Sequence, residues 1–467
     1  MRLEKMRDWM GRHVDPLYVQ AAVFAALVAV LVYFSHGSTL EQQHPGKRLI
    51  RFEREDMFPE EAAAWRELIA RFERTVPDVK VIMSSSSRGE TSQIREVAGK
   101  LPDVVCSNTF RLYSRRRNFI DLAPLVRRDR KEIDFDDFYP TLIDTCSCEG
   151  RLLVLPYFYN VSLLYYNVDW FEAAGVELPR EDWDYDDYLA AAKKLTEYDE
   201  TGRPVRWGSG VTTTWWLEWL THIHMAGGEF IRPDWRACLI DRPEGVAGLT
   251  LLRDKILRHK VSPRPQDLAN APFLNEVIAM EYAGHTASWV VLRHHAKFRW
   301  DVTLLPQGLK DRHGGERVSV GLGVNPNCAD RELAWQFVKF ATGKEGITRL
   351  VRAGIVPVRK SVTEAEFLRK GPDGRYVRDP QNKAVIFQAL EHTREQSRLP
   401  EFTMLCQLHA QPYVAKVVRG QMTPAAAARE IARECNAILR MLDRRNPDYR
   451  PPRDPASAGT PPKGSAR

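Results

Sequence analysis

The sequence lacks the short motifs that mark the common classes of enzyme. No G-x-S-x-G nucleophile elbow, H-E-x-x-H zinc motif, Walker A loop or Rossmann glycine pattern occurs in its 467 residues. Dense basic patches are also missing, since the net charge is only +7 and the basic residues are scattered apart from the run 115–117. These absences argue against a nucleic-acid partner and favour a protein that is not an enzyme and carries no cofactor.

Cysteine is scarce and odd in number. Seven cysteines leave at least one thiol unpaired in a monomer, and Cys146 and Cys148 form the only close pair. No second Cys/His pair stands at zinc-ligand spacing, and a helix would separate His222 from His224, so no metal site is predicted. We expect most of the cysteines to be small buried residues. A disulfide that links Cys146 or Cys148 to another cysteine is the alternative.

Only one long hydrophobic run is present, from Leu17 to Phe34, and Gln20 alone interrupts it. As a helix the run is about 27 Å long, close to the thickness of a bilayer core. Basic residues precede it, which predicts a cytoplasmic segment 1–16 and an anchor at 17–35 in the inner membrane. The rest of the chain would then face the periplasm or the cell exterior. A cleaved signal sequence is the alternative, although no A-x-A cleavage pattern follows the run.

Hydrophobic residues make up 44% of the chain, which is enough for sizeable cores, and its length calls for two or three lobes. The globular part opens with a strand at 49–52, an amphipathic helix at 59–75 and a strand at 79–83. This β-α-β order predicts an α/β fold with a parallel sheet. The tail 447–467 is rich in Pro, Gly, Ser and Arg and is predicted to be disordered.

The stretch 155–195 carries the strongest pattern. A buried strand at 161–166 leads to Asn167 and Asp169, which can cap a short helix at 170–174, and Asp184 then opens a second helix. This order resembles the signature YYN-x-D-x-F-x-x-A-G-x-x-x-P-x-x-W-x-x-x-x-x-A-A-x-x-L of the extracellular solute-binding proteins (family 1) of ABC transporters. The sugar-binding, maltose-binding-protein-like branch is the most similar.

Further motifs of that family follow in the same order over residues 48–445. They include a strand at 103–107 that resembles the P-D-V element, the A-M-x-x-x-G-x-W turn around 279–289 and the W-D-V strand that begins at 300. The resemblance implies an α/β, two-lobed, type II-like periplasmic-binding-protein fold with a hinge, and the hydrophobic run places a single N-terminal transmembrane helix before it. The lobes expected from it are 48–155 plus 322–355 and 156–321 plus 356–445.

Ligands of open α/β sheets bind beyond the carboxyl ends of the strands, and flat aromatic rings with hydroxyl and amide groups suit a neutral sugar. Trp289 comes from the resemblance, because the family places an aromatic residue there. Asn108 and Tyr157 follow strands, Glu218 could equally sit on a solvated helix face, and one of the two adjacent tryptophans should be core. The predicted ligand-binding residues are Ser86, Asn108, Tyr157, Tyr159, Trp215, Trp216, Glu218, Trp289 and Gly321.

The resemblance implies the substrate-binding component of an ABC importer, which captures a sugar or related polyol between two lobes and delivers it to the permease. We expect a monomer. A membrane-tethered ligand sensor with the same fold is the first alternative, and an anionic or peptide ligand stays open because of Arg88 and Arg111. The second alternative to an importer component is an exported carbohydrate-active enzyme, which would need two carboxylates about 5–10 Å apart in one cleft.

Overall fold

The structure is a computed structural model, which describes residues 43–55, 59–86, 101–211, 215–267, 271–286, 288–310, 314–377 and 379–445. The predicted anchor at 17–35 and the predicted tail at 447–467 lie outside these residues. No helix within the described ranges is long and apolar enough to cross a membrane.

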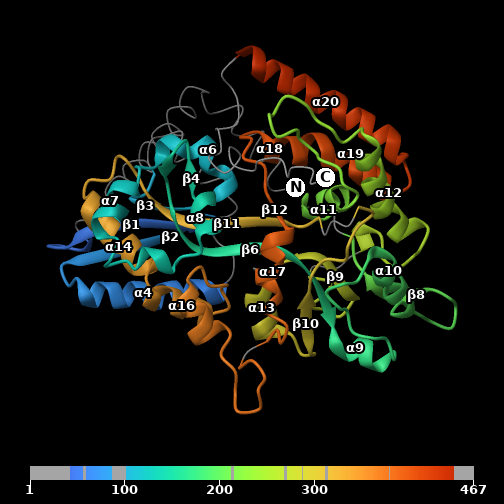
Figure 1. Ribbon diagram of the computed structural model, residues 1–467, viewed down its shortest axis with the longest axis horizontal. Helices are drawn as coiled ribbons and strands as arrows, with labels where there is room; N and C mark the ends of the chain where they lie inside the picture. The colour runs from blue at the N-terminus through green and yellow to red at the C-terminus, as the bar shows by residue number, and fades with distance from the viewer. Residues whose placement is uncertain are drawn as a thin grey trace, which may run out of the picture.

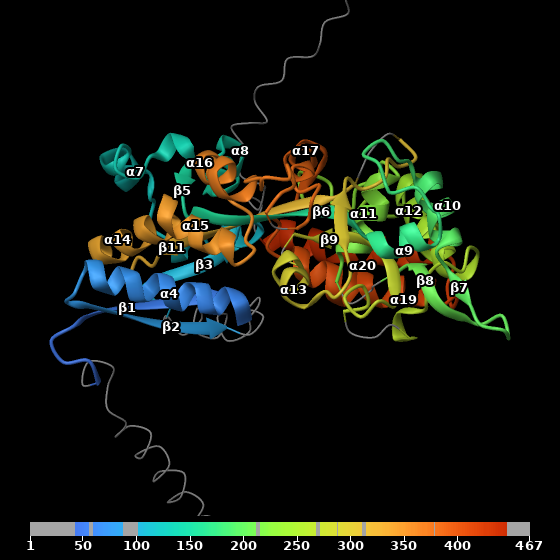
Figure 2. The same cartoon turned by 90° about the horizontal axis from the view of Figure 1, so that it is seen from below.

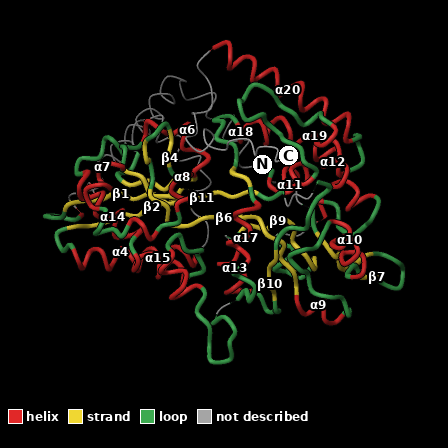
Figure 3. The backbone as a smooth tube through the Cα atoms, viewed as in Figure 1, coloured by secondary structure: helices red, strands yellow, loops and turns green. Residues whose placement is uncertain are grey.

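A single mixed sheet of ten strands runs through the molecule (Figures 1 and 3). The strand order is β2-β1-β3-β11-β6-β9-β8-β7, with β10 paired to β6 and β12 paired to β11. These strands are β1 (Arg48–Glu55), β2 (Val79–Ser86), β3 (Val104–Asn108), β6 (Leu155–Asn167), β7 (Glu197–Tyr198), β8 (Pro204–Ser209), β9 (Ile278–His285), β10 (Trp300–Thr303), β11 (Glu316–Val324) and β12 (Arg394–Glu395). A separate small hairpin consists of β4 (Ser147–Cys148) and β5 (Arg151–Leu152).

Helices cover both faces of this sheet. The half of the molecule that contains β1, β2 and β3, called the first lobe below, carries α4 (Pro59–Thr75), α6 (Leu112–Arg115), α7 (Ala123–Asp129), α8 (Pro140–Thr145), α14 (Arg331–Thr342), α15 (Lys344–Arg352) and α16 (Lys360–Val362). The rest of the molecule carries α9 (Val168–Ala173), α10 (Tyr185–Lys194), α11 (Leu217–Met225), α12 (Pro243–Leu257), α13 (Ser288–His295), α17 (Val385–His392), α18 (Phe402–Met404), α19 (Gln411–Val418) and α20 (Pro424–Arg445).

Strand β6 joins the two lobes, as Figure 2 shows. Its first half, from Leu155 to Val161, pairs with β11, and its second half, from Ser162 to Asn167, pairs with β9 and β10. All thirteen of its side chains are buried, which is why the sequence here is an almost continuous apolar run. Strand β11 returns beside it, so two neighbouring strands cross between the lobes.

Local sequence signals set many of the element ends. The predicted β-α-β opening is confirmed, because β1 and β2 pair in parallel on either side of α4. Asn167 caps α9 by accepting a hydrogen bond from the backbone N–H of Trp170. Asp184 opens α10 with a reciprocal capping box to Asp187. These caps satisfy backbone donors that the first helical turn leaves unpaired.

The chain after β11 visits both lobes. Buried Arg359 donates hydrogen bonds to the carbonyls of Ile133 and Thr342 in the first lobe. Further on, Asn436 of α20 accepts a hydrogen bond at 2.8 Å from the backbone N–H of Cys238 in the second lobe. The lobe boundaries expected within 322–445 stay predictions, because these contacts show which lobe single residues touch and do not show where one lobe ends and the other begins.

Candidate functional site

Strand directions bring the carboxyl ends of two sets of parallel strands to the junction of the lobes. β1, β2 and β3 are parallel to each other, and β11 is antiparallel to β3 and to β6. β1, β2 and β3 therefore run in the same direction as β6, from the first lobe toward the second. β8 and β9 are parallel to each other and run against β6, which is toward the first lobe. Loops after both sets therefore meet at the junction, where such sheets bind ligands.

Two predicted site residues end strands on the first-lobe side. Ser86 is the last residue of β2 and Asn108 is the last residue of β3, opposite Val320 of β11. Asn108 is half-buried and its side chain does not cap the 3-10 turn η1 (Thr109–Arg111) that follows. The amide of Asn108 therefore lies at the strand end that faces the other lobe.

Adjacent tryptophans stand on the second-lobe side, between β8 and α11. Trp215 is 40% exposed, whereas Trp216 is fully buried, as expected for one member of the pair. The two rings stack with their centroids 3.8 Å apart and their planes at 23°, and Trp216 meets Phe402 edge to face. Trp215 thus presents a flat indole face, supported from behind by the core of the second lobe.

Glu218 is neither exposed nor solvated. Its carboxylate lies 3.0 Å from the ammonium of Lys255 on α12, and both side chains are nearly fully buried. Lys255 also donates a hydrogen bond at 2.9 Å to the carbonyl of Gly210, the first residue after β8. Burial acts to lower the pKa of Lys255, but the Glu218 carboxylate and Tyr188 outweigh it and raise that pKa. Glu218 and Lys255 therefore form a buried ion pair that holds the start of the 210–216 segment.

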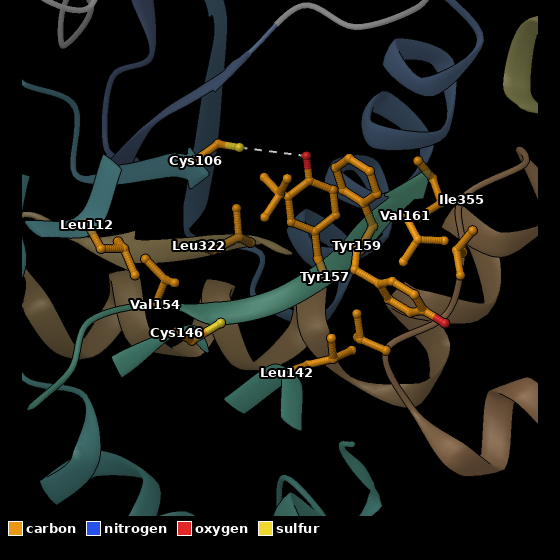
Figure 4. Close-up of a cluster of buried hydrophobic side chains, with 14 of the residues drawn as sticks. Cys106, Leu112, Leu142, Cys146, Val154, Tyr157, Tyr159, Val161, Leu322 and Ile355 are labelled. Carbon is orange, nitrogen blue, oxygen red and sulfur yellow. Dashed lines mark hydrogen bonds between the residues drawn. The ribbon is translucent and has the colours of Figure 1, made fainter. Parts of the chain in front are cut away.

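Tyr157 and Tyr159 are fully buried on β6. The hydroxyl of Tyr157 lies 3.6 Å from the thiol of Cys106, toward which it points in Figure 4, and donates to Glu61 at 3.4 Å. Burial raises the pKa of both phenols well above the usual value. The hydroxyl of Tyr159 has no hydrogen-bond partner among the described residues. Tyr157 is therefore engaged within the first lobe, and a ligand contact for either residue stays a prediction.

Trp289 and Gly321 are also enclosed. Trp289 opens α13 with no exposed surface, and its ring stacks on Phe367 at 5.8 Å with the planes 5° apart. Gly321 lies in β11 at a register shift, where a Cβ atom would stand 2.5 Å from Cγ2 of Val154 and 2.8 Å from the Leu155 carbonyl oxygen. Gly321 thus allows the two crossing strands to approach closely. Ligand contacts of Trp289 and Gly321 stay predictions.

The structure adds contacts across the junction that the sequence reasoning missed. Tyr113 of α6 packs edge to face on Trp235 with the ring centroids 5.0 Å apart, and both are buried. Arg398 donates to the carbonyls of Thr145 and Ser147. Only the abundance of aromatic residues hinted at such a contact, since nothing local pairs residues so far apart in the chain.

A metal centre finds no support at His222 and His224. Burial, followed by the nearby Lys255 charge, lowers the pKa of His222 to about 3, so its ring is neutral. Its Nδ1 lies 2.8 Å from the Glu218 carbonyl, whereas Nδ1 of His224 faces the Gly314 carbonyl at 3.2 Å. No cluster of three or more His, Cys, Asp or Glu able to hold a metal occurs among the described residues.

Comparison with known proteins identifies relatives of this arrangement. The family model for bacterial extracellular solute-binding proteins matches residues 58–348. Among curated proteins, the chain is similar to the arabinooligosaccharide-binding protein of Bacillus subtilis (strain 168), with 24% identity over 355 residues. That alignment covers 69% of this chain and 76% of the relative.

Solved structures share the fold. The ABC substrate-binding protein Lmo0181 from Listeria monocytogenes, in complex with cycloalternan, superposes with a TM-score of 0.73 at 24% identity. That match covers 84% of this chain and 99% of the other. UgpB from Mycobacterium tuberculosis, in complex with glycerophosphocholine, superposes with a TM-score of 0.70 at 20% identity, covering 85% and 100%. At such identities the likeness shows the two-lobed fold.

Proposed function

The chain belongs to the bacterial extracellular solute-binding proteins of ABC importers, and we propose that the solute it binds is an oligosaccharide or a related polyol. The observation that carries the sugar assignment is Trp215, an exposed indole stacked on Trp216 at the junction of the lobes. An aromatic face of this kind packs against the apolar face of a sugar ring. The names of the Bacillus and Listeria relatives, which bind an arabinooligosaccharide and cycloalternan, support the same class.

The proposed mechanism is closure of the two lobes around the ligand. β6 and β11 cross between the lobes side by side, so bending at these strands moves one lobe against the other. A ligand that contacts both lobes binds the closed state more tightly and shifts the population toward it. Trp215 supplies the second-lobe surface, and Asn108 supplies a polar group from the first lobe.

Glu218 acts in this proposal as a positioning residue. Its carboxylate is neutralised by Lys255, and Lys255 in turn holds the Gly210 carbonyl at the base of the segment that leads to Trp215. A sugar hydroxyl would have to compete with a buried charge partner for this carboxylate, which is unfavourable. The pair therefore fixes the aromatic platform and leaves ligand contact to Trp215.

Location and partners follow from the family. An extracellular solute-binding protein works outside the cytoplasm. We propose that residues 17–35 tether this protein to the inner membrane and that it is a monomer. Tethering raises its effective concentration near the permease subunits that receive the solute. The absence of enzymatic activity is part of the same proposal, because the Glu218 carboxylate is held by Lys255.

One second ligand class is favoured by a specific observation. UgpB, which has the same fold, was solved with glycerophosphocholine, so a glycerophosphodiester is the alternative ligand. Sensing in place of transport would use the same lobes and is distinguished by whether a permease is present.

A thermal-shift screen of the full chain tests the proposal. The ligands are arabinooligosaccharides, maltooligosaccharides, a cyclic tetrasaccharide and glycerophosphocholine. We expect one oligosaccharide class to raise Tm, because a ligand that binds only the folded state stabilises it. Trp215→Ala should weaken that ligand about tenfold, or about 1.4 kcal/mol. Tyr198→Ala is the matched control, since Tyr198 is an exposed aromatic residue on β7. A shift with glycerophosphocholine alone would replace the sugar by the second class.

A further inference from the structure

Two of the seven cysteines meet inside the second lobe. The side chain of Cys238 lies beside that of Cys435 on α20, and the two side chains are 3% and 0% exposed. The neighbouring Asn436 accepts the hydrogen bond from the Cys238 backbone N–H at 2.8 Å, which fixes the two chain segments against each other. Two neighbouring buried thiols, on segments that a hydrogen bond already ties together, are placed to form a disulfide.

We propose that Cys238 and Cys435 form a disulfide when the protein folds outside the cytoplasm. This proposal rests on the extracellular family of the chain and not on the identity of the ligand. Disulfides form and persist in such oxidising compartments, whereas the same thiols would stay reduced in the cytosol.

The remaining cysteines have other neighbours. Cys106 faces the Tyr157 hydroxyl, Cys146 contacts Thr145, and Cys328 contacts Asp103. Cys148 is buried beside Glu149 and the arginines Arg398, Arg116 and Arg151. Cys406 lies near both Glu316 and Cys435, and among the described residues its thiol makes no hydrogen bond to the thiol of Cys435. The pair Cys238–Cys435 is therefore the one that the described geometry selects.

The chemistry is thiol–disulfide exchange with an external protein disulfide as the oxidant. One thiolate attacks that disulfide to form a mixed disulfide, and the second thiolate then displaces the external thiolate. The two cysteines lose two protons and two electrons, and the external disulfide becomes two thiols. Burial raises the pKa of Cys238 well above its usual value, so the native thiolate is rare. The bond should therefore form while the chain folds, before α20 seals the pair.

The crosslink would tie α20 to the segment that carries Trp235. Trp235 adopts a left-handed backbone conformation with φ of 62° and packs on Tyr113 of the first lobe. Such a conformation is costly for a large side chain and persists only when its surroundings hold it. A disulfide three residues away would supply part of that restraint, so the bond stabilises the second-lobe half of the contact between the lobes.

Counting thiols in the full chain tests the proposal. The protein is expressed with its own N-terminal segment, and export is checked by protease access from outside spheroplasts. Free thiols are blocked with N-ethylmaleimide at lysis and under denaturant. We expect five labels, which is seven cysteines less the two in the bond. After reduction, iodoacetamide should then label Cys238 and Cys435, and mass spectrometry of the unreduced digest should show their peptides joined.

Two variants serve as matched controls. Cys328→Ser should leave the bond intact and give four labels, whereas Cys238→Ser should give six labels and no joined peptides. Reductant should lower Tm of the wild type and leave Tm of Cys238→Ser unchanged. Seven labels on the exported wild-type protein, or a bond that joins Cys406 to Cys435, would overturn the proposal. Both readouts are independent of any ligand, so a failure here is distinct from a failure of the proposed function.

Discussion

The ammonium of Lys255 lies 3.0 Å from the carboxylate of Glu218, in the interior of the second lobe. The same ammonium donates to the carbonyl of Gly210 and stands over the rings of Tyr188 and Tyr282, at 5.5 and 4.9 Å from their centroids. One buried cation thus links α11, α12 and the end of β8. Its position holds Gly210, the first residue after β8, against the two helices without contact to a ligand.

Breaking this pair should cost far more stability than breaking an exposed one. In Lys255→Met the Glu218 carboxylate stays buried without its partner, and we expect the free energy of unfolding to fall by about 3–5 kcal/mol. Adding Glu218→Gln should recover part of that loss. The exposed cation of Arg299, which pairs with Asp169 and Glu172, is the matched control, and Arg299→Met should cost less than about 1 kcal/mol. Urea denaturation measures all four proteins, and equal losses for Lys255→Met and Arg299→Met would contradict this account.

The contact between Tyr113 and Trp235 should influence closure. Tyr113→Ala removes the ring from the first-lobe side, which forfeits about 0.5–1.5 kcal/mol of aromatic packing beyond the area lost. We expect small-angle X-ray scattering to report a larger radius of gyration for this variant than for the wild type. Tyr113→Phe keeps the ring and should leave the radius unchanged. If both variants scatter like the wild type, the contact has no part in setting the lobe arrangement.

Stability should depend on pH through Glu316, which begins β11. Burial raises the pKa of Glu316 to about 8 from a usual value of 4.5. Between these values the folded state keeps a proton that the unfolded state releases, so the free energy of unfolding decreases as pH rises. Glu316→Gln removes this proton exchange, and Tm should then fall less between pH 5 and 8 than in the wild type. The exposed Glu391 provides the control, and Glu391→Gln should follow the wild-type curve.

Gly321→Ala separates packing from ligand contact. A Cβ atom at this position would stand 2.5 Å from Cγ2 of Val154 and 2.8 Å from the Leu155 carbonyl oxygen, and one of these is backbone. We expect a loss of about 1–3 kcal/mol from this overpacking, measured as a lower Tm without ligand. An unchanged Tm with weaker ligand binding would instead favour the contact role predicted for Gly321.

Local signals predicted much of the fold. The bounds of α4 and the caps Asn167 and Asp184 follow from residues within one helical turn, and the α/β order followed from the β-α-β opening. The environment of Glu218 could not be read in this way, because Lys255 lies on another helix. The sequence shows which side chains end strands, but burial depends on packing between distant segments.

Trp289 illustrates the same limit. Its place in the first turn of α13 agrees with the family pattern, yet its enclosure by Phe367 arises from a segment of the chain that no spacing rule connects to it. Trp215 and Trp216 were predicted to differ in burial because adjacent residues face different ways, and this is confirmed. Which of the two is exposed depends on Phe402 behind Trp216.

Calorimetric titration of the full chain with arabinooligosaccharides, maltooligosaccharides and glycerophosphocholine tests the central claim most directly. The account predicts saturable binding of one oligosaccharide class at one ligand per chain, with a negative heat-capacity change as the Trp215 face is covered. It also predicts about tenfold weaker binding by Trp215→Ala and unchanged binding by Tyr198→Ala. Binding of glycerophosphocholine alone, or oligosaccharide binding that Trp215→Ala leaves intact, would contradict it.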